Sequence, residues 1–224
     1  MTPTELTGRA RSHLIEVPEI GSAMHRAVVA PFTAMRQAAL AAGIDLAPAS
    51  AFRDFDRQLA IWNGKYTGRR PTAGPDGTPL DLTLLSAMQR VEAILRWSAL
   101  PGASRHHWGT DLDLYDRSAV PADVGPRLEA AEYAPGGPFA RASTWLERHA
   151  ARFGFFRPYR GRWSGVQAEP WHYSFAPVAH GAAHALEVGM LRDALTAAPL
   201  EGKDAVLGAI DAIHARYVAR IDPF

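Results

Sequence analysis

The chain has 224 residues, enough for one large domain or two small ones. Apolar residues make up 47% of it and charged residues 21%, as in an ordinary globular protein, and the formal net charge of +1 excludes a general electrostatic footprint for nucleic acid or for a membrane surface. The absence of cysteine excludes disulfides and thiolate chemistry, so a metal ion must be held by His, Asp or Glu.

The N-terminal sequence lacks the continuous apolar core of a secretory signal, and no later apolar run is long enough to span a bilayer. We therefore expect a protein without a transmembrane segment that is cytoplasmic. The alternative is a periplasmic or cell-wall-associated protein whose signal has been removed.

The first third of the chain is expected to contain a helix, a strand and a long loop. The Ala-rich segment 22–42 predicts a helix that stops at Gly43, with Pro31 either kinking it or marking its true start. Segment 46–53 predicts a short strand followed by a turn. Segment 64–79 is rich in Gly and Pro and predicts a long loop.

Asp81 is a candidate N-cap for the next helix. In that helix, apolar residues that recur at helical spacing are expected to face the core: Leu84, Met88, Val91 and Leu95. Segment 110–116 alternates polar and apolar residues and predicts a strand, with Asp111 and Asp113 on one face. Segment 117–138 is rich in Pro and Gly and predicts an excursion from the core.

The C-terminal part is expected to contain more helix than strand. Segment 141–154 predicts a helix capped by Gly154, and segment 161–177 predicts a turn followed by a strand. Two helices are expected to close the chain. The last should present one apolar face, made by Val206, Ile210, Ile213 and Tyr217. Helices mixed with short strands predict an α+β domain.

The stretch SRHHWGTDLD, residues 104–113, combines two metal-ligand residue types with a glycine. A catalytic zinc ion usually takes three protein ligands and leaves a fourth position for water. His106 and Asp113 supply two ligands from this local unit, and Gly109 permits the turn that brings them together.

A third ligand is expected from EPWH, residues 169–172. Glu169 and His172 would point to opposite faces of a strand, so Pro170 must bend the backbone if both serve one site. His172 can then bind the metal, while Glu169 takes a proton from the attacking water and passes it to the leaving amine.

These stretches resemble two motifs of the M15 zinc peptidases, Ser-x-His-x-x-Gly-x-x-x-Asp and Glu-x-x-His. Members of this family are D-alanyl-D-alanine carboxypeptidases and dipeptidases, LD-carboxypeptidases and phage endolysins that act on peptidoglycan peptides. The VanY-like carboxypeptidase branch, M15B, also has a Ser-x-x-Arg stretch with Gln five residues beyond the Arg, which resembles Ser50, Arg53 and Gln58 here. The resemblance covers about residues 45–177.

The resemblance implies a role for each matching residue. His106, Asp113 and His172 would be ligands of one Zn²⁺ per chain, and Glu169 would be general base and then general acid. Three further matching residues would serve the substrate: Arg53 at the scissile carbonyl oxygen or on the peptide, and Ser104 and Gln58 in binding it. An arginine suits the first of these roles because its guanidinium is always charged and donates in a fixed fork.

The resemblance also implies an architecture. We expect a small central antiparallel sheet flanked by helices, as in the zinc D-Ala-D-Ala peptidases, in a single peptidase domain over residues 1–224. Its core would span about residues 45–177, with N- and C-terminal helical extensions. The long segments 64–79 and 117–138 exceed a minimal version of this fold and are expected to shape the substrate cleft.

Asp111 departs from the family pattern, which usually has a small apolar residue at this position. A carboxylate here would hydrogen-bond a ligand histidine, select a cationic substrate group or disturb the site, and its role stays open. His107 is expected at the cleft wall or surface, because its side chain should point away from the metal. His180 and His184 are expected to be surface histidines, because they lack the Glu of a His-Glu-x-x-His pair.

The predicted function is zinc-dependent hydrolysis of a peptide bond near the C-terminus of a peptidoglycan stem peptide, by a D-alanyl-D-alanine carboxypeptidase. The alternatives within enzymes are an LD-carboxypeptidase and an endolysin-type endopeptidase. The alternative of another class is a non-catalytic, metal-containing cell-wall-binding module, whose structural metal would have four protein ligands. Two histidines and a carboxylate also suit other first-row metal ions, and the oligomeric state leaves no sequence signal.

Overall fold

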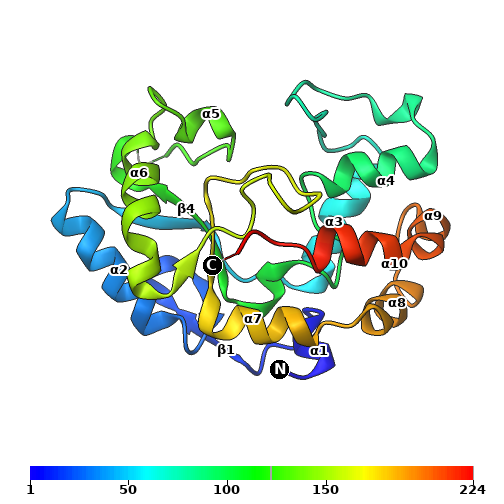
Figure 1. Cartoon of the computed structure of the whole chain (residues 1–224), viewed down its shortest axis with the longest axis horizontal. Coiled ribbons are helices and arrows are strands. Elements are labelled where there is room, and N and C mark those ends of the chain that lie inside the picture. The colour runs from blue at the N-terminus through cyan, green and yellow to red at the C-terminus, as the bar shows by residue number, and fades with distance from the viewer. Residues whose placement is uncertain (122, 224) are drawn as a thin grey trace.

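A four-stranded antiparallel sheet, ordered β3-β4-β6-β5, lies at the centre of the computed structural model, which describes residues 1–121 and 123–223 (Figure 1). Its strands are β3 (Leu46–Ser50), β4 (Asp111–Asp116), β5 (Phe155–Phe156) and β6 (His172–Phe175). A separate hairpin of β1 (Leu14–Val17) and β2 (Ser22–His25) lies near the N-terminal end. The expected α+β fold with a small antiparallel sheet flanked by helices is confirmed.

The two faces of the central sheet have different surroundings because side chains alternate along a strand. Leu112 and Leu114 of β4 are completely buried and belong to a core shared with helices α2 (Val29–Ala41) and α6 (Ala140–His149). Asp111 and Asp113 project to the opposite face. The sheet therefore presents an apolar face to two helices and an acidic face to the rest of the molecule.

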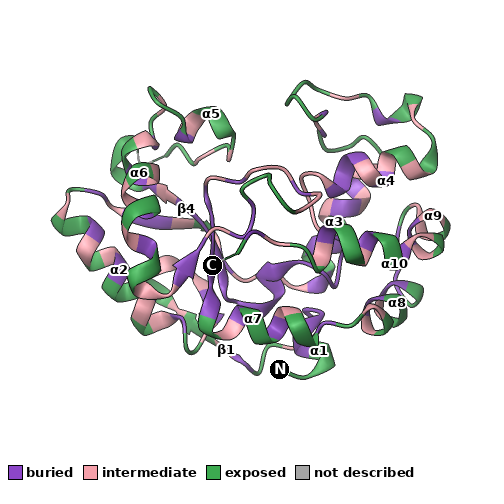
Figure 2. Cartoon of the chain, viewed as in Figure 1, coloured by how far each residue is buried: buried purple, intermediate pink, exposed green. Residues whose placement is uncertain are grey.

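A helical lobe with its own apolar core lies beside this sheet, on the right in Figure 1. Its helices are α1 (Pro3–Leu6), α3 (Phe55–Tyr66), α4 (Ala87–Leu95), α7 (Ala176–Ala185), α8 (Val188–Thr196), α9 (Lys203–Gly208) and α10 (Ile210–Ile213). The short helix α5 (Ala130–Tyr133) belongs to the excursion between β4 and α6. In Figure 2 the strands are mostly buried, whereas this excursion and the loop before α4 are largely exposed.

The helix expected over residues 22–42 is shorter than predicted. Residues Ser22–His25 form β2, which pairs with β1, and the helix begins at Val29. Pairing with a distant strand overrides the helical preference of an Ala-containing segment. Pro31 lies in the first turn of α2, where a missing N–H costs no helical hydrogen bond, so it marks the start of the helix.

Helix α3 was not among the predicted elements, and the expected loop over 64–79 begins only after Tyr66. The signals were present in the sequence. Asp54 caps the helix by accepting a hydrogen bond from the Arg57 N–H at 2.7 Å. Phe55, Leu59 and Trp62 then recur at helical spacing and are buried.

The prediction that Asp81 caps the next helix was wrong, because Asp81 caps only the single turn Leu82–Leu84. The capping residue of α4 is Ser86, which forms a reciprocal capping box with Gln89. Leu84 lies outside α4 and is 82% exposed, so it is not part of the core face, whereas Val91 and Leu95 are buried as expected.

The described part of the C-terminal region, up to residue 223, contains four α-helices, α7 to α10, rather than the two expected. Gly202 and Ala209 mark breaks between them, with φ values of +70° and −116°. The predicted apolar face is nevertheless confirmed, because all four of its members are buried: Val206, Ile210, Ile213 and Tyr217. The helix ending at Gly154 is also confirmed, with Gly154 in the left-handed region at φ +82°.

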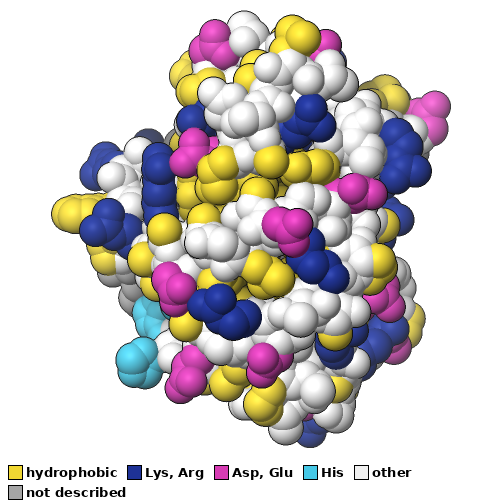
Figure 3. Space-filling model, turned by 90° about the vertical axis from the view of Figure 1, so that its right-hand side faces the viewer, with side chains coloured by type: hydrophobic (Ala, Val, Ile, Leu, Met, Phe, Trp, Pro, Cys, Tyr) yellow, Lys and Arg dark blue, Asp and Glu magenta, His cyan; other side chains and the backbone are white. Residues whose placement is uncertain are grey.

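Charged side chains of both signs lie on the surface. On the face shown in Figure 3, acidic and basic side chains of the described residues are interspersed, with no broad area of one sign. Within residues 1–121 and 123–223, no helix combines the length and the apolar character needed to cross a bilayer.

Gly109 generates the first prediction. Its φ is +65°, and an added Cβ would lie 2.5 Å from Leu14 Cδ2 and 2.7 Å from the His25 backbone nitrogen. We expect Gly109→Ala to reduce the free energy of unfolding by about 3 kcal/mol or more, because left-handed strain adds to a clash with backbone. Urea unfolding would measure this.

The matched control is Gly68, whose φ is +73° and around which no atom lies within 4 Å of an added Cβ. Gly68→Ala should cost only the conformational strain, about 1 kcal/mol. Equal losses for the two substitutions would contradict the close approach at Gly109.

Candidate active site

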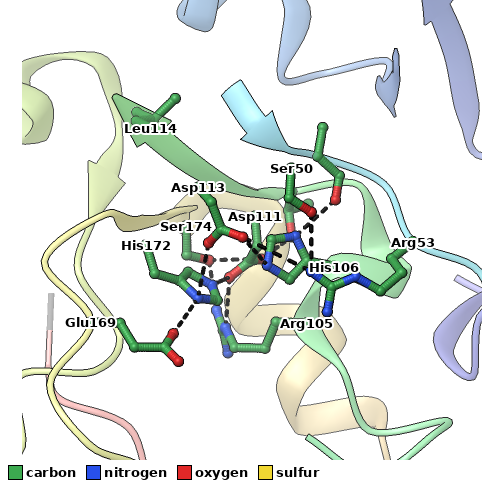
Figure 4. A network of polar contacts seen from close by, with 12 residues as sticks. Ser50, Arg53, Arg105, His106, Asp111, Asp113, Leu114, Glu169, His172 and Ser174 are labelled. Atoms are coloured by element: carbon green, nitrogen blue, oxygen red, sulfur yellow. Dashed lines mark hydrogen bonds and ion pairs between the residues drawn. The ribbon is translucent and has the colours of Figure 1, made fainter. Parts of the chain in front are cut away.

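Three side chains with metal-ligand atoms meet on the acidic face of the central sheet (Figure 4). His106 comes from the single turn Arg105–Trp108, Asp113 from β4 and His172 from the start of β6. Asp113 and His172 are directly paired in the antiparallel register. The three ligand atoms lie within 4.8 Å of one another, and all three residues are buried.

His106 is oriented by a backbone carbonyl. Its Nδ1 lies 2.7 Å from the Ala51 oxygen, so Nδ1–H donates to that carbonyl. Its Nε2 faces the site and lies 3.3 Å from Asp113 Oδ2. A histidine held in this way through one nitrogen presents the other to a metal.

His172 is held through its other ring nitrogen, Nε2. Its Nε2 lies 2.9 Å from Asp111 Oδ1, whereas its Nδ1 lies 2.8 Å from Glu169 Oε2 and 3.7 Å from Asp113 Oδ1. The expected bend is present, because the His172 N–H donates to the Glu169 carbonyl at 3.2 Å across a turn that contains Pro170. Glu169 therefore reaches the same site as His172.

The carboxylates around His172 stabilise the protonated, positively charged form of its ring. Burial alone would lower the pKa of His172, but hydrogen bonds to Asp111 and Glu169 outweigh it and raise the pKa to about 10. Burial likewise raises the pKa of Asp113, but His106, His172 and Arg53 outweigh it and hold the pKa below its usual range. Asp113 Oδ1 is buried and accepts no hydrogen bond from the described residues.

An unpartnered buried carboxylate oxygen is costly unless a cation or donor meets it. Here Oδ1 lies 3.7 Å from His172 Nδ1, and Oδ2 of the same carboxylate lies 3.3 Å from His106 Nε2. Nitrogen and carboxylate oxygen are donor atoms that zinc accepts. The donor set therefore fits a divalent metal ion of the zinc type.

Asp111 lies behind His172 and is completely buried. Besides His172, it accepts hydrogen bonds from Arg105 Nε at 2.8 Å, Thr110 Oγ1 at 2.6 Å and Ser174 Oγ at 3.0 Å. Burial raises its pKa, but Arg105 and His172 outweigh this and lower it. With all these partners Asp111 supports a candidate ligand histidine, and it is too enclosed to select a cationic substrate group.

Arg105 is the functional neighbour that sequence reasoning missed. It is 4% exposed, pairs with Asp111 and also donates through NH2 to Ser174 Oγ at 2.6 Å. The signal was an arginine between Ser104 and His106 in a chain with an additional aspartate at position 111.

The cluster lies at the base of a cleft of about 620 Å³. Segments 70–79 and 127–129 contribute to the walls, so the two long excursions flank the site as expected. Ser104 also lines the cleft, although it is 2% exposed.

Arg53 reaches the cleft from the segment after β3. Its NH1 donates to Gln58 Oε1 at 2.8 Å and its NH2 to Ser50 Oγ at 3.1 Å, while NH2 lies 3.9 Å from Asp113 Oδ2. Gln58 is completely buried behind Arg53, and its Nε2 donates to the Ala99 carbonyl at 2.7 Å. Gln58 was expected to bind the substrate, but its side chain is fully buried and instead holds the Arg53 guanidinium.

His107 does not lie at the cleft wall or surface as expected, because it is completely buried. Its Nε2 accepts a hydrogen bond from the Gly102 N–H at 3.0 Å, and its Nδ1–H donates to the Arg53 carbonyl at 2.6 Å. Burial lowers its pKa to about 3, so the ring is neutral and ties the Arg53 backbone to the metal-ligand turn. His180 and His184 are exposed on α7, as expected.

An α+β scaffold with two histidines, a carboxylate and a neighbouring glutamate at the base of a cleft has the features of a metallopeptidase. The VanY family, described as D-alanyl-D-alanine carboxypeptidase, matches residues 21–178. The chain therefore belongs to the VanY family of the M15 peptidases, and it is a peptidase. The resemblance seen in the motifs is confirmed.

Two relatives illustrate the range of similarity. An uncharacterized protein of Haemophilus influenzae is 46% identical over 103 residues, which are 45% of this chain and 70% of that protein. A D-alanyl-D-alanine carboxypeptidase of Enterococcus faecalis is 28% identical over 144 residues, which are 63% of this chain and 44% of that protein.

Similar solved structures share the fold. VanYB in complex with D-alanine-D-alanine has a TM-score of 0.54 at 21% identity, over 82% of this chain and 88% of that one. A mutant of the D,D-pentapeptidase VanY in complex with Zn(II) has a TM-score of 0.53 at 19% identity, over 88% and 92%. The LdcB LD-carboxypeptidase has a TM-score of 0.52 at 21% identity, over 87% and 77%.

The position of Asp111 generates a prediction about metal affinity. Asp111→Asn keeps the side-chain shape but removes the charge that holds His172 through Nε2. We expect zinc affinity to fall about 10- to 100-fold, as for other outer-shell partners of ligand histidines. Competition with a chromophoric chelator would measure it, with circular dichroism confirming that the variant is folded.

Asp116→Asn is the matched control, because Asp116 is a buried aspartate of the same strand. Within the described residues, its carboxylate accepts hydrogen bonds from Asp45 and Ser118 and from no residue of the site. Its zinc affinity should equal that of the wild type. A similar affinity loss in both variants would assign the effect of Asp111 to general destabilisation.

Proposed function

We propose that the protein is a zinc-dependent peptidase that hydrolyses a bond near the C-terminus of peptidoglycan stem peptides, as a D-alanyl-D-alanine carboxypeptidase. One observation carries the proposal: His106, Asp113 and His172 converge at the base of the cleft, with Glu169 beside them. Membership of the VanY family and the D-alanine-D-alanine and Zn(II) complexes of similar structures support it.

The residues proposed to hold one Zn²⁺ per chain are His106 through Nε2, His172 through Nδ1 and Asp113 through its carboxylate. When bound, the ion would polarise the scissile carbonyl and lower the pKa of water to about 7. Asp111 and the Ala51 carbonyl keep the two histidines in the required tautomers.

Glu169 is proposed as general base and then general acid. Its carboxylate accepts the hydrogen bond of His172 Nδ1–H when that nitrogen carries a proton. Once Nδ1 serves as a ligand, this proton is lost and the Glu169 carboxylate is available to take a proton from water. Glu169 then returns the proton to the leaving amine.

Arg53 is proposed to stabilise the negative charge that develops on the scissile carbonyl oxygen, because its guanidinium reaches the cleft near Asp113. Ser104 is proposed to bind the substrate from the cleft lining. We assign Gln58 to holding Arg53, because it is buried behind the guanidinium.

Two enzyme alternatives share this chemistry. An LD-carboxypeptidase and an endopeptidase would use the same metal site and differ in how many residues the cleft accepts beyond the scissile bond. The non-catalytic binding module is disfavoured, because the described residues supply one group of three potential ligands together with a well-placed acid, rather than four ligands.

The proposed function is tested with a D-alanyl-D-alanine-terminated pentapeptide, with metal analysis and mass spectrometry. We expect about one zinc per chain and loss of one D-alanine, which a chelator abolishes and added zinc restores. Tripeptide and tetrapeptide stems in parallel would identify an LD-carboxypeptidase by its products. Zinc binding without cleavage of any stem peptide would contradict the proposal.

Glu169→Gln separates proton transfer from metal binding. We expect kcat to fall about 10²- to 10⁴-fold, the usual contribution of general acid–base catalysis, with zinc content unchanged. Asp56→Asn is a control on an exposed acid of α3 and should leave kcat unaltered. Near wild-type activity of zinc-loaded Glu169→Gln would rule out this role.

A further inference from the structure

Lys65 is a half-buried lysine in the last turn of α3 whose side chain lines the cleft. Its Nζ donates to Ser98 Oγ at 2.7 Å, across to the segment that follows α4. A lysine near a helix end often stabilises the last helical carbonyls. Here the ammonium instead bonds to another element, and both partners line the cleft.

Lys65 lacks an ion-pair partner among the described residues. Within the part of the chain that the structure describes, no carboxylate lies within ion-pair distance of its Nζ. Burial lowers its pKa to about 8, and Arg53 and Arg70 act in the same direction, whereas Glu169 opposes them. Charged groups removed from water are normally paired, so this ammonium is suited to receive an anion.

The other charges around the cleft are already paired or committed. Arg105 pairs with Asp111 through Nε and donates to Ser174 through NH2, and its remaining nitrogen, NH1, is buried away from solvent. Arg127 lies 3.3 Å from Glu129. Arg53 is held by Gln58 and Ser50 beside Asp113.

Arg70 is a second cation at the same end of α3. Its backbone N–H donates to the Gly64 carbonyl at 2.8 Å, and its Cδ lies 3.0 Å from where a Cβ on Gly64 would be. It is exposed and lines the cleft near Lys65. The cleft wall formed by the end of α3 therefore carries positive charge that the described residues do not neutralise.

We propose that Lys65 and Ser98 form a subsite for the free C-terminal carboxylate of the peptide substrate. The inference rests on the proposed function and deepens it. Glu169 gives its proton to the leaving amine, and the carboxylate of the leaving residue is attached to the same Cα as that amine. The anchoring cation must then line the same cleft as Glu169. Lys65 and Ser98 both line that cleft, and no carboxylate of the described residues pairs with Lys65.

This subsite has a consequence for specificity. A peptide that continues beyond the leaving residue has no carboxylate at this position and would leave the ammonium unpaired. The subsite thus selects a carboxypeptidase reaction over cleavage inside a stem or a cross-bridge.

The test compares two substrates, an N-acylated L-Lys-D-Ala-D-Ala peptide with a free C-terminal carboxylate and the same peptide with a C-terminal carboxamide. Wild-type enzyme should prefer the acid. Lys65→Met should lower kcat/KM for the acid by about 30-fold or more, the effect of removing one partner of a buried charge pair, and change kcat/KM for the amide little. Lys65→Arg, which keeps a cation, should recover part of the preference.

Lys203 is the matched control, because the chain has only two lysines and the Lys203 side chain on α9 bonds to the Thr196 carbonyl. Lys203→Met should leave both substrates unaffected. Lys65→Gln is a second removal of the charge in case Lys65→Met fails to fold, and zinc content and circular dichroism confirm the integrity of each variant.

The pH dependence gives an independent readout. Raising the pH through about 8 should neutralise free Lys65 and reduce kcat/KM for the acid but not for the amide, and Lys65→Arg should remove this difference. The charged groups that act on Lys65 are Glu169, Arg53 and Arg70.

Three outcomes would overturn the inference. Equal cleavage of acid and amide by wild-type enzyme, or an equal loss for both substrates in Lys65→Met, would remove the carboxylate subsite and leave the peptidase function standing. Cleavage of neither peptide by zinc-loaded wild-type enzyme would contradict the proposed function, and the subsite with it.

Discussion

The antiparallel register between β4 and β6 is the constraint on which the site depends. It sets Asp113 opposite His172 and Asp111 opposite Ser174, while Leu112 and Leu114 project into the core under α2 and α6. A slip of one residue would turn both aspartates into that apolar layer and both leucines into the cleft. The apolar packing on one face of the sheet therefore fixes the positions of the polar groups on the other.

The polar face is built in two layers behind the cleft. The first contains His106, Asp113 and His172, which face one another. Behind it, Arg105 neutralises Asp111, and Asp111 fixes the tautomer of His172. Removing one partner from such a buried pair is far more costly than removing a surface pair, so Arg105 and Asp111 are best regarded as one unit. His107 adds a third connection, from the metal-ligand turn to the Arg53 backbone.

The cluster was predictable from the sequence because the residues that identify it lie in two short stretches. Residue types and spacing in SRHHWGTDLD and EPWH identify the candidate ligands, and alternation in DLDLYD places two aspartates on one face. The role of Asp111 and the burial of His107 depend on partners more than 50 residues away in the sequence, Ser174 and His172 for one and Arg53 for the other. No local pattern encodes those contacts.

The errors in the predicted secondary structure also arise from features that the local residue pattern does not encode. Residues 22–25 form a strand because β1 pairs with them, and Leu84 is exposed because the chain turns once before α4 begins. In contrast, the apolar face ending at Tyr217 was predictable, because helical spacing continues through the breaks between short helices. Helix α3 could also have been predicted locally, because Asp54 is a capping residue directly before a segment with apolar residues at helical spacing.

The central claim is that three side chains hold a zinc ion and leave a position for chemistry. X-ray absorption spectroscopy at the zinc edge of the metal-loaded protein, compared with Glu169→Gln, tests it most directly. The account predicts two imidazole nitrogens, one carboxylate oxygen and a further light-atom ligand from solvent, with the same protein ligands in the variant. A fourth protein ligand, or a first shell that loses a ligand in Glu169→Gln, would contradict it and favour a structural metal.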